Sequence, residues 1–245
     1  MRIGILGDIH GNLEALTAVV DAMRAEHPDL WVQVGDLVGY GPDPGPCIEL
    51  VRGLGCLVCM GNHDAAVLDL LDTAYFNNFA REAVEWTKEH LPEEHLSYLR
   101  SLGLVVHHPE FTVVHGTLHM PEQFGYVISA VEAMDSLALQ QSRVCFVGHS
   151  HVPAIYMKRD QGDLFVAPYQ PEIRVDTAGF ARVLVNVGSV GQPRDEDPRA
   201  TFALYDTETE VVEIRRVVYD IRGVQEKILR AGLPPMLANR LSLGV

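Results

Sequence analysis

Cysteine is scarce in this chain, with four residues in 245. Four cysteines are too few for a disulfide framework at this length, so we expect reduced thiols. Cys56 and Cys59 form a C-x-x-C pair, but no second pair exists to complete a structural zinc site. Because both lie in an apolar run that is typical of a buried strand, we interpret them as small core residues.

Long hydrophobic runs are also absent. No apolar stretch approaches the roughly 18 residues that a membrane span needs. The first residues run straight into a strand-like pattern, without the basic segment and apolar stretch of a secretory signal. We therefore expect a soluble, cytoplasmic protein with no membrane partner.

Basic residues are few, with 19 Lys and Arg against 33 Asp and Glu and a formal net charge of −14. This balance argues against a protein that grips the nucleic-acid backbone, because such binding needs a surface rich in Lys and Arg. We expect no stable nucleic-acid binding, although nucleic acid is not excluded as a substrate. Part of the negative charge suits divalent cations, and the rest is typical of a solvated surface.

Hydrophobic residues make up 47% of the chain, enough for one large domain spanning 1–245. Apolar runs alternate with helical patterns, which indicates the α/β class. The runs are Ile3–Leu6, Leu30–Val34, Leu57–Met60, Leu104–His107, Phe111–His115, Val144–Val147 and Ala181–Val187. We expect a helix capped by Asn12, a helical cap-like segment at about 65–102, a hairpin or loop insertion at 158–179, strands over 201–219 and a helical extension at about 224–241.

Five short motifs place a carboxylate, amide or imidazole directly after an apolar run, where a fold of this class builds its site. They are Asp8-Ile9-His10, Gly35-Asp36, Gly61-Asn62-His63-Asp64, His115-Gly116 and Gly148-His149-Ser150-His151. Taken singly, each is as well explained by a turn, a helix cap or a surface histidine. Together they form a mixed nitrogen and oxygen set that suits Mn, Fe, Zn, Ni or Co better than Ca or a thiolate site.

In this order the five motifs resemble the calcineurin-like metallophosphoesterase superfamily, over residues 1 to about 191. Within it the chain resembles the YfcE-like prokaryotic phosphodiesterases, on the evidence of the run Asn186-Val187-Gly188-Ser189-Val190-Gly191-Gln192-Pro193-Arg194. The resemblance implies a four-layer α/β/β/α sandwich, in which two mixed β-sheets lie face to face with helices outside.

The resemblance also implies a dinuclear centre. One divalent ion, most often Mn, would be held by Asp8, His10, Asp36 and His151, and a second by Asp36, Asn62, His115 and His149. A hydroxide bridging the two ions would attack phosphorus in line, because paired cations lower the pKa of a shared water and neutralise phosphoryl oxygens. Asn62 and His115 would also lie beside the bound phosphate.

Three further residues are candidates for contact with substrate or for catalysis. His63 is not needed as a ligand and suits protonation of the leaving oxygen. Asp64 either orients the His63 ring or caps the following helix, and we weigh the two equally. Arg194 either binds the phosphate oxygens or forms a surface salt bridge with the acidic residues beside it. Tyr40 and Tyr75 are candidate cleft walls, although aromatic residues are more often core.

The leading hypothesis is a phosphodiesterase acting on a small phosphate ester or nucleotide. A phosphomonoesterase, resembling protein phosphatases or dinucleoside-polyphosphate hydrolases, is a second enzyme hypothesis because those branches share the opening motif. A catalytically inactive binding scaffold is disfavoured because every ligand position is filled. The sequence leaves open whether the chain forms a homo-oligomer.

Overall fold

The strands form two six-stranded mixed sheets. The computed structural model describes residues 1–245. The first sheet has the order β3-β2-β1-β11-β12-β9 and the second the order β4-β5-β6-β10-β7-β8. Their bounds are β1 Arg2–Leu6, β2 Leu30–Gln33, β3 Leu57–Val58, β4 Val105–His108, β5 Phe111–Val114, β6 Val144–Val147, β7 Ala154–Lys158, β8 Leu164–Val166, β9 Ile173–Asp176, β10 Arg182–Asn186, β11 Ala200–Asp206 and β12 Val211–Val217.

The inner faces of the two sheets share one apolar core. Alternate residues of a strand point to opposite faces, so Ile3 and Ile5 of β1 enter this core while Leu6 joins the helix side. From the second sheet Val113 and Phe146 pack into the same cluster. Burial of these branched and aromatic side chains between the sheets stabilises their face-to-face packing.

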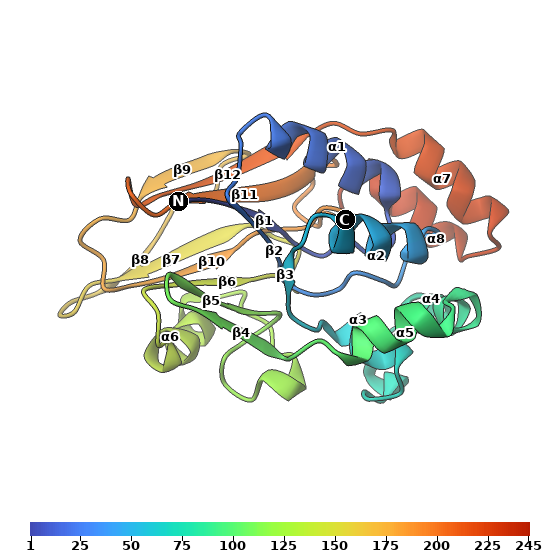
Figure 1. Ribbon diagram of the computed structural model, residues 1–245, viewed down its shortest axis with the longest axis horizontal. Helices are drawn as coiled ribbons and strands as arrows, with labels where there is room; N and C mark the ends of the chain where they lie inside the picture. The colour runs from blue at the N-terminus through green and yellow to red at the C-terminus, as the bar shows by residue number, and fades with distance from the viewer.

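Helices cover the outer faces of both sheets. In Figure 1, α1 lies above the first sheet and α6 below the second, while α3, α4, α5, α7 and α8 gather at one end. The bounds are α1 Leu13–Arg24, α2 Pro44–Gly53, α3 Asn62–Val67, α4 Asn78–His90, α5 Glu93–Arg100, α6 Ala130–Leu139, α7 Ile221–Arg230 and α8 Pro235–Asn239, with short 3-10 helices at Thr73–Tyr75 (η1), Pro121–Gln123 (η2) and Arg240–Ser242 (η3). The four-layer α/β/β/α prediction is confirmed.

Each sheet contains three neighbouring parallel strands, which form one half of the first sheet and the middle of the second. β1, β2 and β3 run parallel in the first sheet, and β5, β6 and β10 run parallel in the second. All five ligand motifs follow the carboxyl ends of these strands, so the loops that carry them meet at one edge of the sandwich. The local prediction for the first loop holds, since the Asn12 side chain accepts a hydrogen bond from the Ala15 amide at 3.0 Å and caps α1.

The segment 158–179 differs from the hairpin or loop that its sequence indicated. β8 does form a hairpin with β7, but β9 crosses over and pairs with β12 in the other sheet. The helical segment expected at about 65–102 begins earlier, at Asn62, because Gly61 leads directly into α3.

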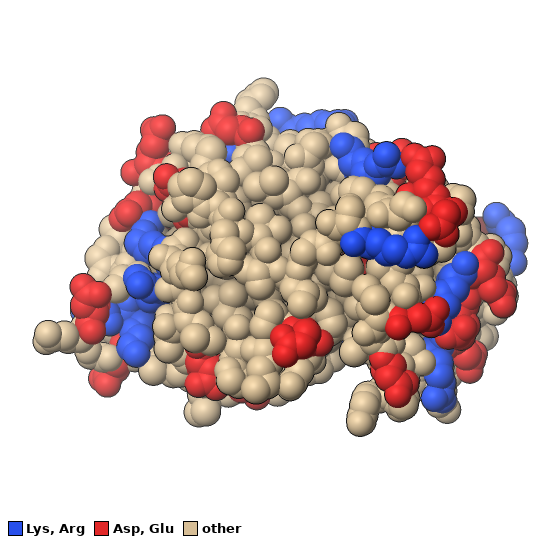
Figure 2. All heavy atoms as spheres, turned by 60° about the horizontal axis from the view of Figure 1, so that its bottom comes forward, with Lys and Arg blue, Asp and Glu red and all other residues tan.

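Charged side chains gather toward the two ends of the face in Figure 2, and its middle is mostly uncharged. No helix combines the length and the apolar character that crossing a bilayer would require.

Candidate metal centre

The residues that follow the parallel strands lie in strained backbone. Asp8, His10, Asp36, His149 and His151 all have φ between 37° and 68°, the left-handed region that L-residues with a Cβ disfavour. Such conformations cost on the order of 1–3 kcal/mol each and persist where the surrounding structure enforces them. Five in one place indicate a functional site rather than ordinary turns.

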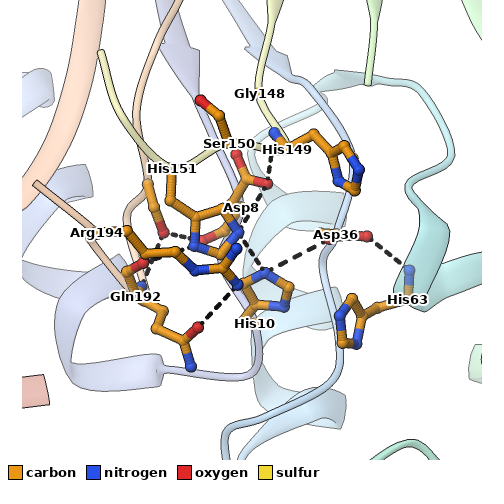
Figure 3. Close-up of polar contacts among 12 residues, drawn as sticks. Asp8, His10, Asp36, His63, Gly148, His149, Ser150, His151, Gln192 and Arg194 are labelled. Atoms are coloured by element: carbon orange, nitrogen blue, oxygen red, sulfur yellow. Dashed lines mark hydrogen bonds and ion pairs between the residues drawn. The ribbon is translucent and has the colours of Figure 1, made fainter. Parts of the chain in front are cut away.

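A first cluster joins Asp8, His10, Asp36 and His151, all buried, with ligand atoms within 4.8 Å of one another. Nε2 of His151 lies 3.3 Å from Oδ1 of Asp8, and Nε2 of His10 lies 3.5 Å from Oδ2 of Asp36. Figure 3 shows these side chains pointing toward one another. The arrangement brings together the four residues predicted for one metal.

A second cluster joins Asp36, His115 and His149. Nε2 of His115 lies 3.3 Å from Oδ2 of Asp36, 3.1 Å from Nδ1 of His149 and 3.0 Å from Oδ1 of Asn62. Asn62 therefore adds an amide oxygen as a fourth donor group beside this cluster. Asp36 belongs to both clusters, as the predicted bridging role requires.

Backbone carbonyls orient three of the imidazoles. Nδ1 of His10 donates to the Val38 carbonyl (3.0 Å), Nδ1 of His115 to Val34 (2.9 Å) and Nδ1 of His151 to Gln192 (2.6 Å). When the ring is neutral, this leaves the Nε2 lone pair facing the cluster, which is the usual arrangement of metal-binding histidines.

The donor set fits a pair of divalent cations. Oδ2 of Asp8 is buried without a hydrogen-bond partner, although a buried carboxylate oxygen is costly unless it is paired. Burial lowers the pKa of His10 and His149 well below the usual value, which favours the neutral imidazole that binds metal. Burial acts to raise the pKa of Asp36, but the adjacent His115 and other imidazoles hold it well below its usual range.

Gly148 shows how closely the ligands approach the backbone. A Cβ at this position would lie 2.3 Å from Oδ2 of Asp8, so any larger residue would displace the carboxylate. The glycine of this motif is therefore required by the close packing of the two loops.

His63 lies beside both clusters without joining either. Its ring packs against His10, with centroids 4.8 Å apart, and against Phe76 at 5.0 Å. Its backbone amide donates to Oδ1 of Asp36 at 2.8 Å, and its Nδ1 has no partner. Burial lowers the pKa of His63 to about 4.

No hydrogen bond joins the Asp64 carboxylate to the His63 ring. That carboxylate instead accepts hydrogen bonds from the backbone amides of Asp36 (2.9 Å), Gly61 (3.0 Å) and Val38 (3.2 Å). The first and third of these bonds tie α3 to the loop that carries Asp36, and the second caps the helix. Of the two interpretations, the capping role is the one whose hydrogen bonds are present.

Arg194 forms no salt bridge, in contrast to the surface pairing considered for it. Asp195 pairs with Arg216 and Asp197 with Arg199. The Arg194 side chain points toward the clusters (Figure 3), where Nη2 lies 3.1 Å from Oε1 of Gln192 and Nε has no partner. A half-buried guanidinium that lines a cleft and has no carboxylate partner is placed to bind an anion.

A cleft of about 300 Å³ opens over both clusters. Its floor includes Asp36, Asn62, His149 and His151, and Arg194 lies on one side. The walls combine aromatic and apolar residues, Tyr40, Leu71, Tyr75, Phe76, Phe124 and Tyr126, with the polar residues Asp72, Asn77 and Gln123. Tyr40 and Tyr75 thus line the cleft, as was considered for them.

Sequence reasoning missed Tyr126. Its ring stacks on His149 with centroids 3.8 Å apart, following the 3-10 helix η2. Tyr126 lies in the loop between η2 and α6, where the sequence shows neither a strand nor a helix pattern. Its place in the chain after the His115 motif is the only sequence signal that could have indicated it.

Comparison with known proteins agrees with this geometry. The crystal structure of a metallophosphoesterase from Sphaerobacter thermophilus is 39% identical and superposes with a TM-score of 0.88, each chain being covered in full. An uncharacterized protein of Methanocaldococcus jannaschii is 36% identical over 99% of this chain and 98% of its own length.

A symmetrical bis(5'-nucleosyl)-tetraphosphatase of Psychromonas ingrahamii is 30% identical, but the match spans only 46% of this chain and 42% of that protein. The model of the calcineurin-like phosphoesterase superfamily domain matches residues 1–210. The chain belongs to the calcineurin-like phosphoesterase superfamily, whose members are hydrolases of phosphate esters.

Proposed function

We propose that this protein is a phosphodiesterase that depends on two divalent metal ions, with Mn as the first candidate. The observation that supports it most is Asp36, which lies in both ligand clusters on the floor of the cleft. Asp8, His10, Asp36 and His151 would hold one ion, and Asp36, Asn62, His115 and His149 the other. When bound, the ions would activate a water molecule and offset charge on the phosphoryl oxygens.

Beside the metal ions, Arg194 would bind the phosphate and His63 would act as the general acid. Arg194 lines the cleft beside His149 and His151, and a guanidinium binds phosphate oxygens strongly. His63 lines the same cleft and would give a proton to the leaving oxygen. Its low pKa keeps the ring neutral without substrate, and an anion bound beside it would raise that pKa.

The charge of the cleft favours a diester over a monoester. Apart from the metal ligands, its charged lining residues are one cation, Arg194, and one carboxylate, Asp72. A phosphodiester carries one negative charge, whereas a monoester carries close to two at neutral pH. The apolar wall formed by Leu71, Phe76 and Phe124 offers a surface for the second ester group.

Paired substrates test the proposal. Metal-depleted protein is reloaded with Mn²⁺, and kcat/KM is measured with bis(p-nitrophenyl) phosphate and with p-nitrophenyl phosphate. We expect the diester to be favoured by about tenfold or more, which corresponds to about 1.4 kcal/mol. Diadenosine tetraphosphate serves as a third substrate, because a partial relative is named for that class.

Two variants test whether the measured turnover comes from the proposed metal site. Asp36→Asn should abolish turnover, whereas Asp160→Asn, the same change at an exposed position, should leave it unchanged. A faster reaction with the monoester would assign a phosphomonoesterase. If protein loaded with both ions turns over none of these substrates, the result would support a catalytically inactive binding scaffold.

A further inference from the structure

The C-terminal helices α7, α8 and η3 pack beside the cleft, outside the residues 1–210 that match the family model. We propose that the segment 221–245 is a positioning element of the active site, which fixes the Arg194 guanidinium through Tyr40 and through the loop that follows Arg194. This inference rests on the proposed function, since it assigns Arg194 to the substrate phosphate.

Tyr40 is the link between the segment and the site. It is 7% exposed, and its side chain belongs to the same buried cluster as Leu237 and Leu241. On its other side the ring lies 4.6 Å from the His10 ring and 4.4 Å from the His63 ring. A tyrosine at φ 59° is strained, so packing from both sides is needed to keep it there.

Tyr40 also contacts Arg194. The guanidinium lies over the ring, with its carbon 5.9 Å from the centroid, and Nη2 lies 3.4 Å from the hydroxyl. Because no carboxylate pairs with Arg194, Tyr40 and Gln192 are the side chains that hold its guanidinium. The position of Arg194 therefore depends on the position of Tyr40.

Two polar anchors fasten the segment to the loops that carry these residues. Nζ of Lys227 in α7 lies 2.8 Å from Oδ2 of Asp43, in the loop that carries Tyr40, and 2.6 Å from Oε1 of Glu14. At the other end, the Glu196 amide donates to the Gly244 carbonyl at 2.9 Å, two residues beyond Arg194.

Gly244 allows the second anchor to be perturbed without touching the cleft. Its φ is 66°, and a Cβ there would lie 2.7 Å from backbone atoms of Asp197. Gly232 in the same segment offers a matched control, because its φ is 74° and a Cβ there would meet nothing within 4 Å. Alanine brings similar backbone strain at both positions, but displaces the loop after Arg194 only at Gly244.

The test compares Gly244→Ala with Gly232→Ala in Mn²⁺-loaded protein and a phosphodiester substrate. We expect Gly244→Ala to raise KM by about tenfold while kcat stays within about twofold, because a displaced charge-assisted hydrogen bond weakens substrate binding. Gly232→Ala should leave both constants unchanged. Equal constants in the two variants, or a fall in kcat alone, would overturn the proposal.

A double-mutant cycle separates positioning from general damage. In an Arg194→Ala background, Gly244→Ala should add nothing further, because its effect passes through the missing guanidinium. An additive loss would contradict this route. Tyr40→Phe, which keeps the ring and removes the hydroxyl, should raise KM less than Arg194→Ala does and should lose its effect in the same background.

Hydrogen exchange supplies a readout that does not depend on turnover. We expect Gly244→Ala, and not Gly232→Ala, to speed amide exchange at residues 194–197. If the wild-type protein hydrolyses no phosphoester, the proposed function fails, while this comparison still decides whether the segment holds the loop. Equal exchange in both variants would refute the positioning role.

Discussion

Asp36 offers the sharpest test of a shared metal ligand, through the effect of Mn²⁺ on thermal stability. An ion that binds only the folded state at 100 times its Kd adds about 2.7 kcal/mol per site, hence about 5.4 kcal/mol for two independent sites. For a chain of this size 1 kcal/mol moves Tm by about 2–4 °C, so full loading should raise Tm by about 11–22 °C.

The structure predicts different losses for different ligands. Asp36→Asn affects both clusters and should remove most of the increase in Tm. Asp8→Asn changes a side chain of the first cluster alone and keeps the Oδ1 that accepts the His149 amide, whereas His149→Ala changes the second cluster alone. Each variant should therefore keep about half of the increase in Tm, or about 5–11 °C.

Differential scanning calorimetry of each variant, metal-depleted and then loaded, gives the increase directly. Because each variant is compared with its own metal-free form, effects of the substitution on folding cancel. Metal content by mass spectrometry should show two ions in the wild type, about one in the single-cluster variants, and few in Asp36→Asn. If Asp36→Asn loses no more than His149→Ala, the shared-ligand reasoning is wrong.

Three further predictions concern the same site. His63→Ala should reduce kcat by about 10²–10⁴-fold while the metal content stays at two ions, and a loss of metal would instead make His63 a ligand. Burial opposes protonation of His115, but the Asp36 carboxylate raises its pKa to about 9, so a proton competes with metal below that pH. Calorimetric Mn²⁺ affinity should therefore rise from pH 7 to pH 9, and a flat profile would contradict the assignment. Asp64→Ala leaves three backbone amides unpaired and should lower the free energy of unfolding by about 3 kcal/mol in urea, whereas a catalytic role alone would leave stability unchanged.

The clustering of the candidate ligands could be predicted because its signal is local. Each ligand stands directly after an apolar strand, and parallel strands in one sheet end at one edge, so residues as distant along the chain as Asp8 and His151 meet. The division of these candidate ligands into two clusters rested on the family resemblance, because spacing along the chain does not predict which loops are in contact.

Other features could not be read from sequence because they depend on packing between distant segments. The sequence around Asp64 is compatible both with capping α3 and with orienting His63. The hydrogen bonds of its carboxylate depend on where the Asp36 loop lies, which the local sequence does not give. β9 looks like part of a loop because its pairing with β12 is long-range. Tyr126 stacks on His149 from a separate loop, and no periodic pattern predicts that contact.

The left-handed backbone at the ligand positions bears on how this sequence would change over generations. Glycine at Asp8, His10 or His149 would relieve strain of on the order of 1–3 kcal/mol, yet it would remove a side chain proposed to bind metal. At these positions, selection for stability therefore favours glycine, whereas selection for activity favours the present side chains. A descendant released from its chemistry should drift toward glycine or asparagine there first, long before its core changes.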